Sequence, residues 1–192
     1  ALELLSGCDL FTLLDACTKA KRRIPPALAV TIGVRCARGL AAIHQLAVEG
    51  QAVAHGDVAH KSVMVTHDGR VKMIDLGVAA YQELGQVAPL ARAHAGALTP
   101  EVIAGRPMSP ASDQFALAVL VWEAMTLRRL FMADTPAATS QNILTLDVAT
   151  RFERHAFVPD GLQAVLMRAL ERDPAARYED VAAFGRALEG WL

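Results

Sequence analysis

The sequence has little net charge, few cysteines and no long apolar run, and each absence excludes a class of protein. A formal net charge of -1 over 192 residues leaves no electrostatic footprint for nucleic acid or an anionic membrane. The three cysteines, Cys8, Cys17 and Cys36, lack metal-ligand spacing, and an odd number argues against a disulfide framework. The longest unbroken apolar run, residues 115–122, is too short to cross a bilayer. We therefore expect a soluble, cytoplasmic segment whose thiols stay reduced.

Apolar residues make up 53% of the chain, enough to build a sizeable core. Their spacing predicts a mainly helical structure, because apolar side chains recur every three or four residues in several segments. One helix is entered through Pro25-Pro26, and another, residues 115–125, is apolar throughout, with Trp122 as a core anchor. The apolar stripe of the helix after Pro25-Pro26 consists of Leu28, Ile32, Cys36, Leu40 and Ile43. Two further helices carry the stripes Leu162, Val165, Leu166 and Ala169, and Val181, Phe184 and Leu188. Asp173-Pro174 is expected to end the helix that contains Leu162 to Ala169.

Two acidic motifs flank a predicted β-hairpin. His55-Gly56-Asp57 precedes the hairpin and Asp75-Leu76-Gly77 follows it. Residues 63–65 and 71–74 read as short apolar strands, and His67-Asp68-Gly69 between them supplies the turn. The hairpin places two carboxylates on either side of one rigid unit. That arrangement suits phosphoryl transfer, in which one acid holds the attacking hydroxyl and the other holds Mg²⁺ against the nucleotide phosphates.

This stretch resembles the catalytic and metal-binding loops of eukaryotic-type protein kinases, where His-Arg-Asp precedes a strand pair and Asp-Phe-Gly. The resemblance implies that Asp57 is the catalytic base, that Asp75 is a magnesium ligand, and that His55 is structural. Leu76 stands where phenylalanine is usual. Each motif alone is weak, and the order and spacing of the motifs carry the resemblance.

Further matches follow in the order that the kinase family has them. Thr99-Pro100-Glu101 resembles the end of the activation segment, and Asp113 lies where the long central helix of the large lobe begins. The resemblance implies that Asp113 caps the loop carrying His55, and that Arg177 forms a buried ion pair with Glu101.

The first ten residues resemble the hinge between kinase lobes and the start of the next helix. The resemblance implies that residues 1–192 form a kinase-like large C-terminal lobe, a helical bundle with a small β-hairpin at the active-site cleft. Its own small lobe is expected upstream. The resemblance also implies ATP and Mg²⁺ as cofactors. The implied nucleotide contacts are the backbone groups of Glu3 and Leu5 to adenine, Asp9 to the ribose, and Leu10 with Met64 as an apolar floor under the base.

The catalytic loop departs from the kinase pattern at two positions. Ala59 stands where Ser/Thr kinases have a lysine, and Ser62 stands where an asparagine binds the second magnesium ion. A serine hydroxyl can ligate Mg²⁺, so Ser62 remains a candidate metal ligand. Lys61 could reach the transferred phosphate, as an arginine does from this position in tyrosine kinases, or it could be a solvated loop lysine. His60 is expected at the surface.

The segment expected to be the activation loop lacks phosphate acceptors. No Ser, Thr or Tyr occurs in residues 82–98, although Tyr81 and Thr99 flank them. Gly56 replaces the arginine that pairs with a loop phosphate in many kinases. We therefore expect no switching by phosphorylation of this loop; the alternative is a segment that has degenerated because nothing is catalysed.

Three functions are compatible with these motifs. The first is an ATP-dependent Ser/Thr protein kinase domain of reduced or unusual activity, acting on a protein substrate. The second is a pseudokinase that binds nucleotide or scaffolds a regulated partner, because Ala59 and Ser62 disable the chemistry. The third is a small-molecule kinase of the aminoglycoside phosphotransferase type, which Glu101, Asp113 and Arg177 argue against. We favour the first.

Overall fold

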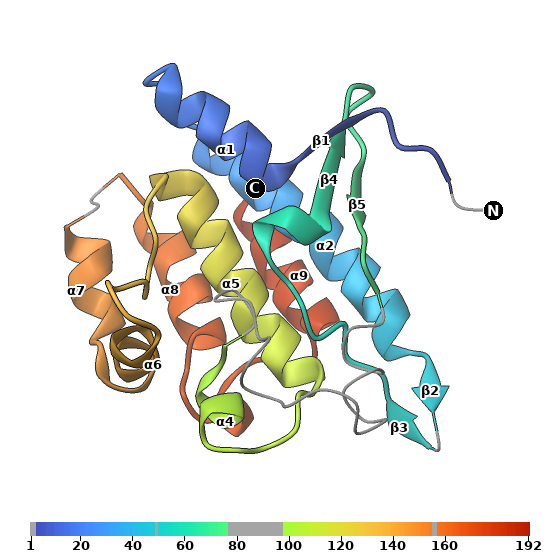
Figure 1. The fold of residues 1–192 in the computed structure, drawn as a ribbon, viewed down its shortest axis with the longest axis vertical. Helices are drawn as coiled ribbons and strands as arrows, with labels where there is room; N and C mark the ends of the chain where they lie inside the picture. Colours follow the sequence, from blue (N-terminus) through green and yellow to red (C-terminus); the bar gives the residue numbers. More distant parts are fainter. Residues whose placement is uncertain (1–2, 49, 77–97, 155–156) are drawn as a thin grey trace.

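A computed structural model describes residues 3–48, 50–76, 98–154 and 157–192. The described residues form a mainly helical body with a small antiparallel sheet at one edge (Figure 1). Gly77, Tyr81 and residues 82–97 lie outside the described residues, so the structure bears on no prediction about the activation loop except at Leu98 and Thr99.

Three helices form the centre of the body. Helix α2 (Pro26–His44) packs against both α5 (Pro110–Thr126) and α9 (Val181–Trp191). As predicted, α5 is buried along almost its whole length, and Trp122 is 1% exposed and packs edge-to-face on Phe152. A helix that is apolar all round belongs inside a protein, and α5 occupies that place.

Helix α2 begins at a proline, whose missing N–H costs nothing in the first helical turn. It is also long and apolar enough to cross a membrane, and 44% of that stretch is buried, with its buried residues in the helical core. The predicted stripe is right at Ile32, Cys36 and Leu40 and wrong at Leu28, which is 50% exposed. Ala29 and Val30 fill the core in the first turn instead of Leu28.

The sheet has three strands in the order β1-β4-β5. The predicted hairpin is present as β4 (Val63–Thr66) and β5 (Val71–Met73), and β1 (Gly7–Asp9) adds antiparallel to β4. Three residues are too few to show an alternating pattern, so the sequence did not indicate β1. Its first residue must be glycine, because a Cβ on Gly7 would lie 2.2 Å from the carbonyl oxygen of Val65.

The remaining elements are short and surround the central helices. They are α1 (Leu10–Lys19), β2 (Ala47–Val48), β3 (Gln51–Ala52), η1 (His60–Ser62), α4 (Pro100–Ile103), α6 (Pro136–Thr145), α7 (Val148–Glu153), α8 (Asp160–Ala169) and η2 (Pro174–Ala176). Helix α8 ends at Ala169, four residues before Asp173-Pro174, which instead cap and begin η2. The sequence patterns indicated α8 but neither α6 nor α7.

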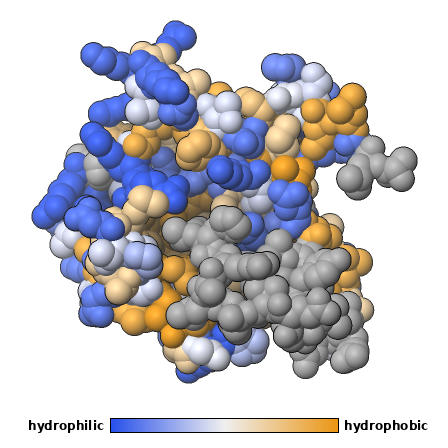
Figure 2. Space-filling view, in the orientation of Figure 1, coloured by the Kyte–Doolittle hydropathy of each residue, from blue (hydrophilic) through white to orange (hydrophobic). Residues whose placement is uncertain are grey.

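The exposed surface is mixed in character. Figure 2 shows polar side chains over α1 and apolar surface at the N-terminal segment ahead of β1. Leu4 in that segment is 95% exposed, and Phe11 at the start of α1 is 50% exposed. The apolar surface therefore lies close to the sheet that carries the predicted cleft.

Candidate active site

Asp113 holds the loop that contains the first acidic motif. Its carboxylate accepts hydrogen bonds from the backbone N–H groups of His55 (2.7 Å) and Gly56 (2.9 Å). The ring of His44, near the end of α2, contacts the same carboxylate at 2.8 Å. Asp113 is 2% exposed, and the two backbone bonds meet the sequence expectation that it caps this loop. Buried polar groups are costly unless they are paired, so the loop has one strongly preferred position.

His55 joins the first acidic motif to the second. Its Nε2 atom lies 3.0 Å from the carbonyl oxygen of Ile74, directly before Asp75, and its Nδ1 atom accepts a bond from the N–H of Asp57 at 3.3 Å. A carbonyl can only accept, so the proton of the ring is on Nε2 and the ring is neutral. His55 is fully buried, as a structural residue should be. The loop of Asp57 and the end of β5 therefore lie side by side.

The two candidate carboxylates have different surroundings. Asp57 is half-buried, whereas Asp75, two residues after the end of β5, is exposed. Asp75 has a φ of 64°, in the left-handed region that few residues other than glycine occupy. Such a conformation is often found where function requires a particular side-chain direction. Gly56, at φ 77°, also lies in this region, and here glycine carries no steric penalty.

Glu101 and Arg177 form the predicted ion pair. The guanidinium donates two parallel bonds to the carboxylate, at 3.0 and 2.8 Å, and both side chains are almost completely buried. Burial raises the pKa of Glu101, but the hydrogen bonds from Arg177 and Ser112 outweigh it, so the pKa lies below its usual range. Arg177 also donates to the carbonyl oxygens of Ala111 and Glu171, which connects α4, α5 and the segment before η2.

The structure places two of the predicted nucleotide contacts side by side and buries a third. Met64 is partly exposed on β4 and stands opposite Asp9 in the sheet, so these two predicted contacts are neighbours. The carboxylate of Asp9 caps α1 by accepting from the N–H of Thr12 at 2.6 Å. Leu10, however, is 0% exposed in the core, which contradicts its predicted contact with adenine. A residue next to a cap begins the helix, and here its side chain turns inward.

Glu3 and Leu5 precede β1, where the resemblance expects hinge backbone groups. Leu5 is partly buried. The exposed side chain of Glu3 pairs with Lys72 on β5 and lies 3.6 Å from Arg70. The hydrogen bond from Lys72 holds the pKa of Glu3 below its usual range. These exposed pairs connect the N-terminal segment to the hairpin but contribute little to stability.

The hydroxyl of Ser62 is turned into its own loop. It lies 2.6 Å from the carbonyl oxygen of Asp57 and 2.8 Å from that of Ala59, and it accepts from the N–H of Ala59 at 2.9 Å. Ser62 is 2% exposed. This geometry favours a role in bracing the loop over the predicted role as a magnesium ligand, because the hydroxyl is already bonded to backbone groups.

Lys61 is exposed and lies over an aromatic ring. Its ammonium is 5.4 Å from the ring centroid of Phe11, within the range of a cation–π contact. The loop cation therefore rests on α1 in this structure, and both readings of Lys61 remain predictions.

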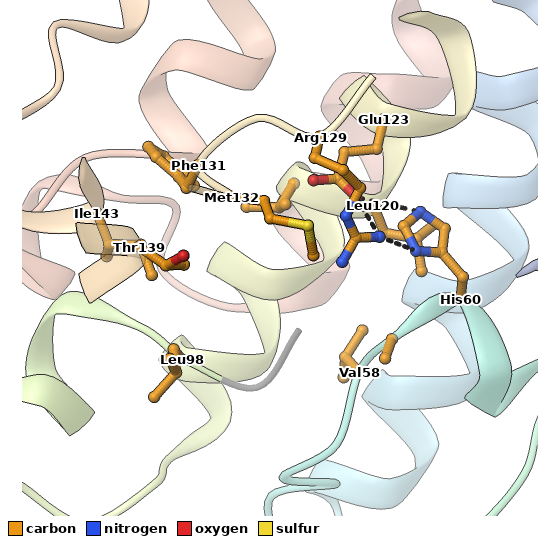
Figure 3. A pocket seen from close by; sticks show the side chains of 12 residues that line it. Val58, His60, Leu98, Leu120, Glu123, Arg129, Phe131, Met132, Thr139 and Ile143 are labelled. Carbon is orange, nitrogen blue, oxygen red and sulfur yellow. Dashed lines mark hydrogen bonds and ion pairs between the residues drawn. The ribbon is translucent and has the colours of Figure 1, made fainter. Parts of the chain in front are cut away.

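His60 is not at the surface, contrary to the sequence expectation. It is 8% exposed and contacts Arg129 and Glu123 beside a small cavity between the catalytic loop and α5 (Figure 3). Burial and, to a lesser extent, the charge of Arg129 together lower the pKa of His60 to about 4. Burial raises the pKa of Glu123 to about 7, although Arg129 and the N–H of Leu130 oppose this. No local pattern indicated this cluster, because its members come from separate segments.

The donors present suit a magnesium ion bound together with nucleotide phosphates. Mg²⁺ is commonly bound through one or two carboxylates plus phosphate oxygens and water, and the exposed carboxylate of Asp75 would supply a hard oxygen ligand of that kind. Among the described residues no cluster of three or more His, Cys, Asp or Glu side chains could hold a metal by itself.

Comparison with known proteins identifies the class to which this fold and site belong. The family described as "Protein kinase domain" matches residues 1–184, and the chain belongs to this family. Kinases of this family typically use ATP and Mg²⁺. The match supports the protein kinase reading over the small-molecule alternative.

Individual relatives agree with the family match. The chain is 28% identical to "Tyrosine-protein kinase MasK" of Myxococcus xanthus over its whole length, covering 30% of that protein. It is 29% identical to "Serine/threonine-protein kinase PknB" of Mycolicibacterium smegmatis over 83% of the chain and 25% of that protein. The fold resembles the crystal structure of the PknI kinase domain of Mycobacterium tuberculosis, with a TM-score of 0.70 and 22% identity over 99% of this chain and 64% of that one. The chain thus spans well under half the length of these two curated relatives.

Proposed function

We propose that the protein containing this chain transfers the γ-phosphoryl group of ATP to a serine or threonine of a protein substrate. Asp57 would orient and deprotonate the attacking hydroxyl, and Asp75 would hold the magnesium ion that bridges the phosphates. Met64 and Asp9 would lie at the nucleotide, with the backbone groups of Glu3 and Leu5 at the adenine edge.

The single observation that carries this proposal is the connection made by His55. Its backbone N–H is bonded to Asp113, and its ring is bonded to the carbonyl oxygen of Ile74. One buried, neutral residue therefore sets the position of the Asp57 loop relative to the start of the Asp75 motif. Phosphoryl transfer depends mainly on such positioning, because little covalent chemistry is asked of the protein.

Preference for serine or threonine rests on two observations. Thr99-Pro100-Glu101 lacks the tryptophan that tyrosine kinases carry just upstream, since residues 91–98 contain none. Several similar proteins carry serine/threonine-protein kinase names, including PknB and PknL of mycobacteria. One similar protein is named a tyrosine-protein kinase, so phosphoamino-acid analysis of the product is part of the test.

A second function, nucleotide binding or scaffolding without transfer, is favoured by the loop itself. Ala59 cannot supply a charge, the hydroxyl of Ser62 is bonded to the loop backbone, and Lys61 lies over Phe11. If Lys61 leaves that ring when nucleotide binds, it is the one cation between Asp57 and β4 that can steady the transferred phosphate. Phosphate transfer therefore depends on whether Lys61 reaches the transferred phosphate.

The test uses the full-length protein and measures MgATP affinity and phosphate transfer separately. Asp75→Asn should weaken MgATP binding by roughly tenfold or more, because it removes the charge that holds the ion. Asp57→Asn should leave the affinity within about twofold and reduce transfer by at least ~100-fold. Lys61→Ala should lower the transfer rate more than the affinity. Asp134→Asn, an exposed aspartate before α6, is the matched control.

The outcomes separate the two candidate functions. Binding of MgATP with no transfer that responds to Asp57 would replace the enzyme proposal by the pseudokinase. A protein that binds no nucleotide at all would leave only a scaffold.

A further inference from the structure

His60 lies three residues after the proposed base and is buried among charged groups. Its side chain is 9% exposed, and it begins η1, the single turn that connects the catalytic loop to β4. A titratable side chain at such a position is expensive to bury unless it is paired. Its partners therefore indicate why it is there.

Both partners of His60 come from the end of α5 and the residues that follow it. The Nη1 atom of Arg129 lies 3.0 Å from Nδ1 of His60, and the same atom lies 2.9 Å from Oε2 of Glu123. Glu123 in turn accepts the N–H of Leu130 at 2.8 Å through its other oxygen. Figure 3 shows the three side chains meeting between α5 and the catalytic loop. Arg129 is thus a bridge between the ring and a buried carboxylate.

The chemistry of the donors determines the form of the ring. A guanidinium can only donate, so Nδ1 of His60 accepts and the proton is on Nε2. Nε2 lies 3.5 Å from Oε2 of Glu123 and has no hydrogen-bond partner among the described residues. A neutral imidazole with this tautomer satisfies the contact with Arg129, and among the described residues lining the cavity the other charged groups are Arg129 and Glu123.

The turn that begins at His60 is hydrogen-bonded to the backbone of Asp57. Residues 60–62 form one turn, and the hydroxyl of Ser62 at its end is bonded to the carbonyl oxygens of Asp57 and Ala59. A shift of His60 would therefore move the turn and the proposed base with it. The cavity beside the ring is small, about 30 Å³.

We propose that His60 is a positioning residue for the catalytic loop: Arg129, oriented by Glu123, holds its ring and thereby sets the place of Asp57. This inference rests on the proposed phosphoryl transfer for its kinetic consequence, but its structural part stands without it. His60 itself touches no reacting atom. Asp113 and the His60 partners therefore secure the loop at two separate points to α5 and the residues that follow it.

The experiment compares wild type, His60→Ala and His60→Asn in the full-length protein, with His67→Ala in the exposed hairpin turn as the control. The amide oxygen of asparagine can accept from Arg129 much as Nδ1 does. Amide hydrogen exchange is followed in peptides covering residues 55–62. Exchange there should be roughly tenfold faster in His60→Ala, because a bond to a charged donor is lost, and should return to within about threefold of wild type in His60→Asn.

The kinetic readout separates positioning from general stability. In His60→Ala the transfer rate should fall about tenfold while KM for MgATP stays unchanged, and His60→Asn should restore the rate. Exchange in α2 and α9 should not change. Unchanged exchange of residues 55–62 in His60→Ala, or an asparagine variant no better than alanine, would overturn the proposal.

Failure of the proposed function and failure of the role assigned to His60 can be told apart. If wild type transfers no phosphate, the proposed function fails, yet the exchange measurement still decides the role of His60. If His60→Ala does not fold, Glu123→Gln serves instead, since glutamine keeps the volume and can accept from Leu130 but loses the charge that orients Arg129. That variant should also speed exchange in residues 55–62, and wild-type exchange would contradict the proposal.

Discussion

Arg177 and Glu101, 76 positions apart in the sequence, meet in a two-bond ion pair inside the protein. The pair connects α4, which closes the predicted activation segment, to the end of η2, where Arg177 is the C-cap residue. Arg177 also lies over the ring of Phe115, 4.9 Å from its centroid. One buried guanidinium therefore holds α4, α5 and the residues around η2 together.

Removing this guanidinium should be strongly destabilising. Arg177→Ala leaves the buried carboxylate of Glu101 without its partner and should cost roughly 3 to 5 kcal/mol of unfolding free energy. Urea unfolding of the variant measures this, with the exposed Arg22→Ala as the matched control. A loss no larger than that of the control would show that the pair does not support the fold.

Replacing the carboxylate of Asp113 by an amide of the same size should destabilise the protein. Asp113→Asn turns an N–H₂ group toward one of the donors that its carboxylate now accepts, His44, His55 or Gly56. We expect a loss of roughly 1 to 3 kcal/mol, since a buried donor is left unsatisfied. Asp134→Asn, exposed before α6, should be neutral in the same thermal unfolding experiment. Equal melting temperatures for the two variants would be evidence against this role of Asp113.

The buried His60 should make the protein sensitive to acid. Its pKa is lowered to about 4, so its contribution to stability is complete above the unfolded value near 6.5 and is lost as the pH falls toward 4. Between pH 7 and pH 5 wild type should therefore lose about 2 kcal/mol relative to His60→Asn.

Urea unfolding of both proteins at the two pH values checks this. The raised pKa of Glu123 acts in the opposite direction, because its stabilising contribution is complete below about pH 4.5 and is lost as the pH rises toward 7. Comparison with His60→Asn isolates the histidine. Parallel pH profiles for the two proteins would contradict the burial of a neutral ring.

Gly7 should be required for the third strand. A Cβ at this position would lie 2.2 Å from the carbonyl oxygen of Val65, so Gly7→Ala must separate β1 from β4. The N-terminal segment should then exchange amide hydrogens faster, and the unfolding free energy should fall by roughly 1 to 3 kcal/mol. In Gly190→Ala, on α9, the added methyl meets nothing within 4 Å, so that variant should be neutral or slightly stabilising. If both variants behave alike, the close approach of the two strands is not important.

Local patterns in the sequence were enough to predict the long elements and the order of the motifs. Helices α2, α8 and α9 follow from apolar periodicity, α5 follows from an unbroken apolar segment, and the β4–β5 hairpin follows from two apolar runs around a glycine turn. The Glu101–Arg177 pair and the Asp113 cap were predicted because the resemblance relates distant motifs that spacing alone cannot connect. Periodicity and motif order are properties of the chain itself, so they can be recognised without coordinates.

Only the tertiary structure decided which side chains face the site. Leu10 and His60 carry no local sign of burial, yet one fills the core and the other meets Arg129 and Glu123. The direction of the Ser62 hydroxyl likewise depends on the backbone of its loop. Burial and hydrogen bonding depend on packing between segments far apart in the chain, and local sequence carries no record of that packing.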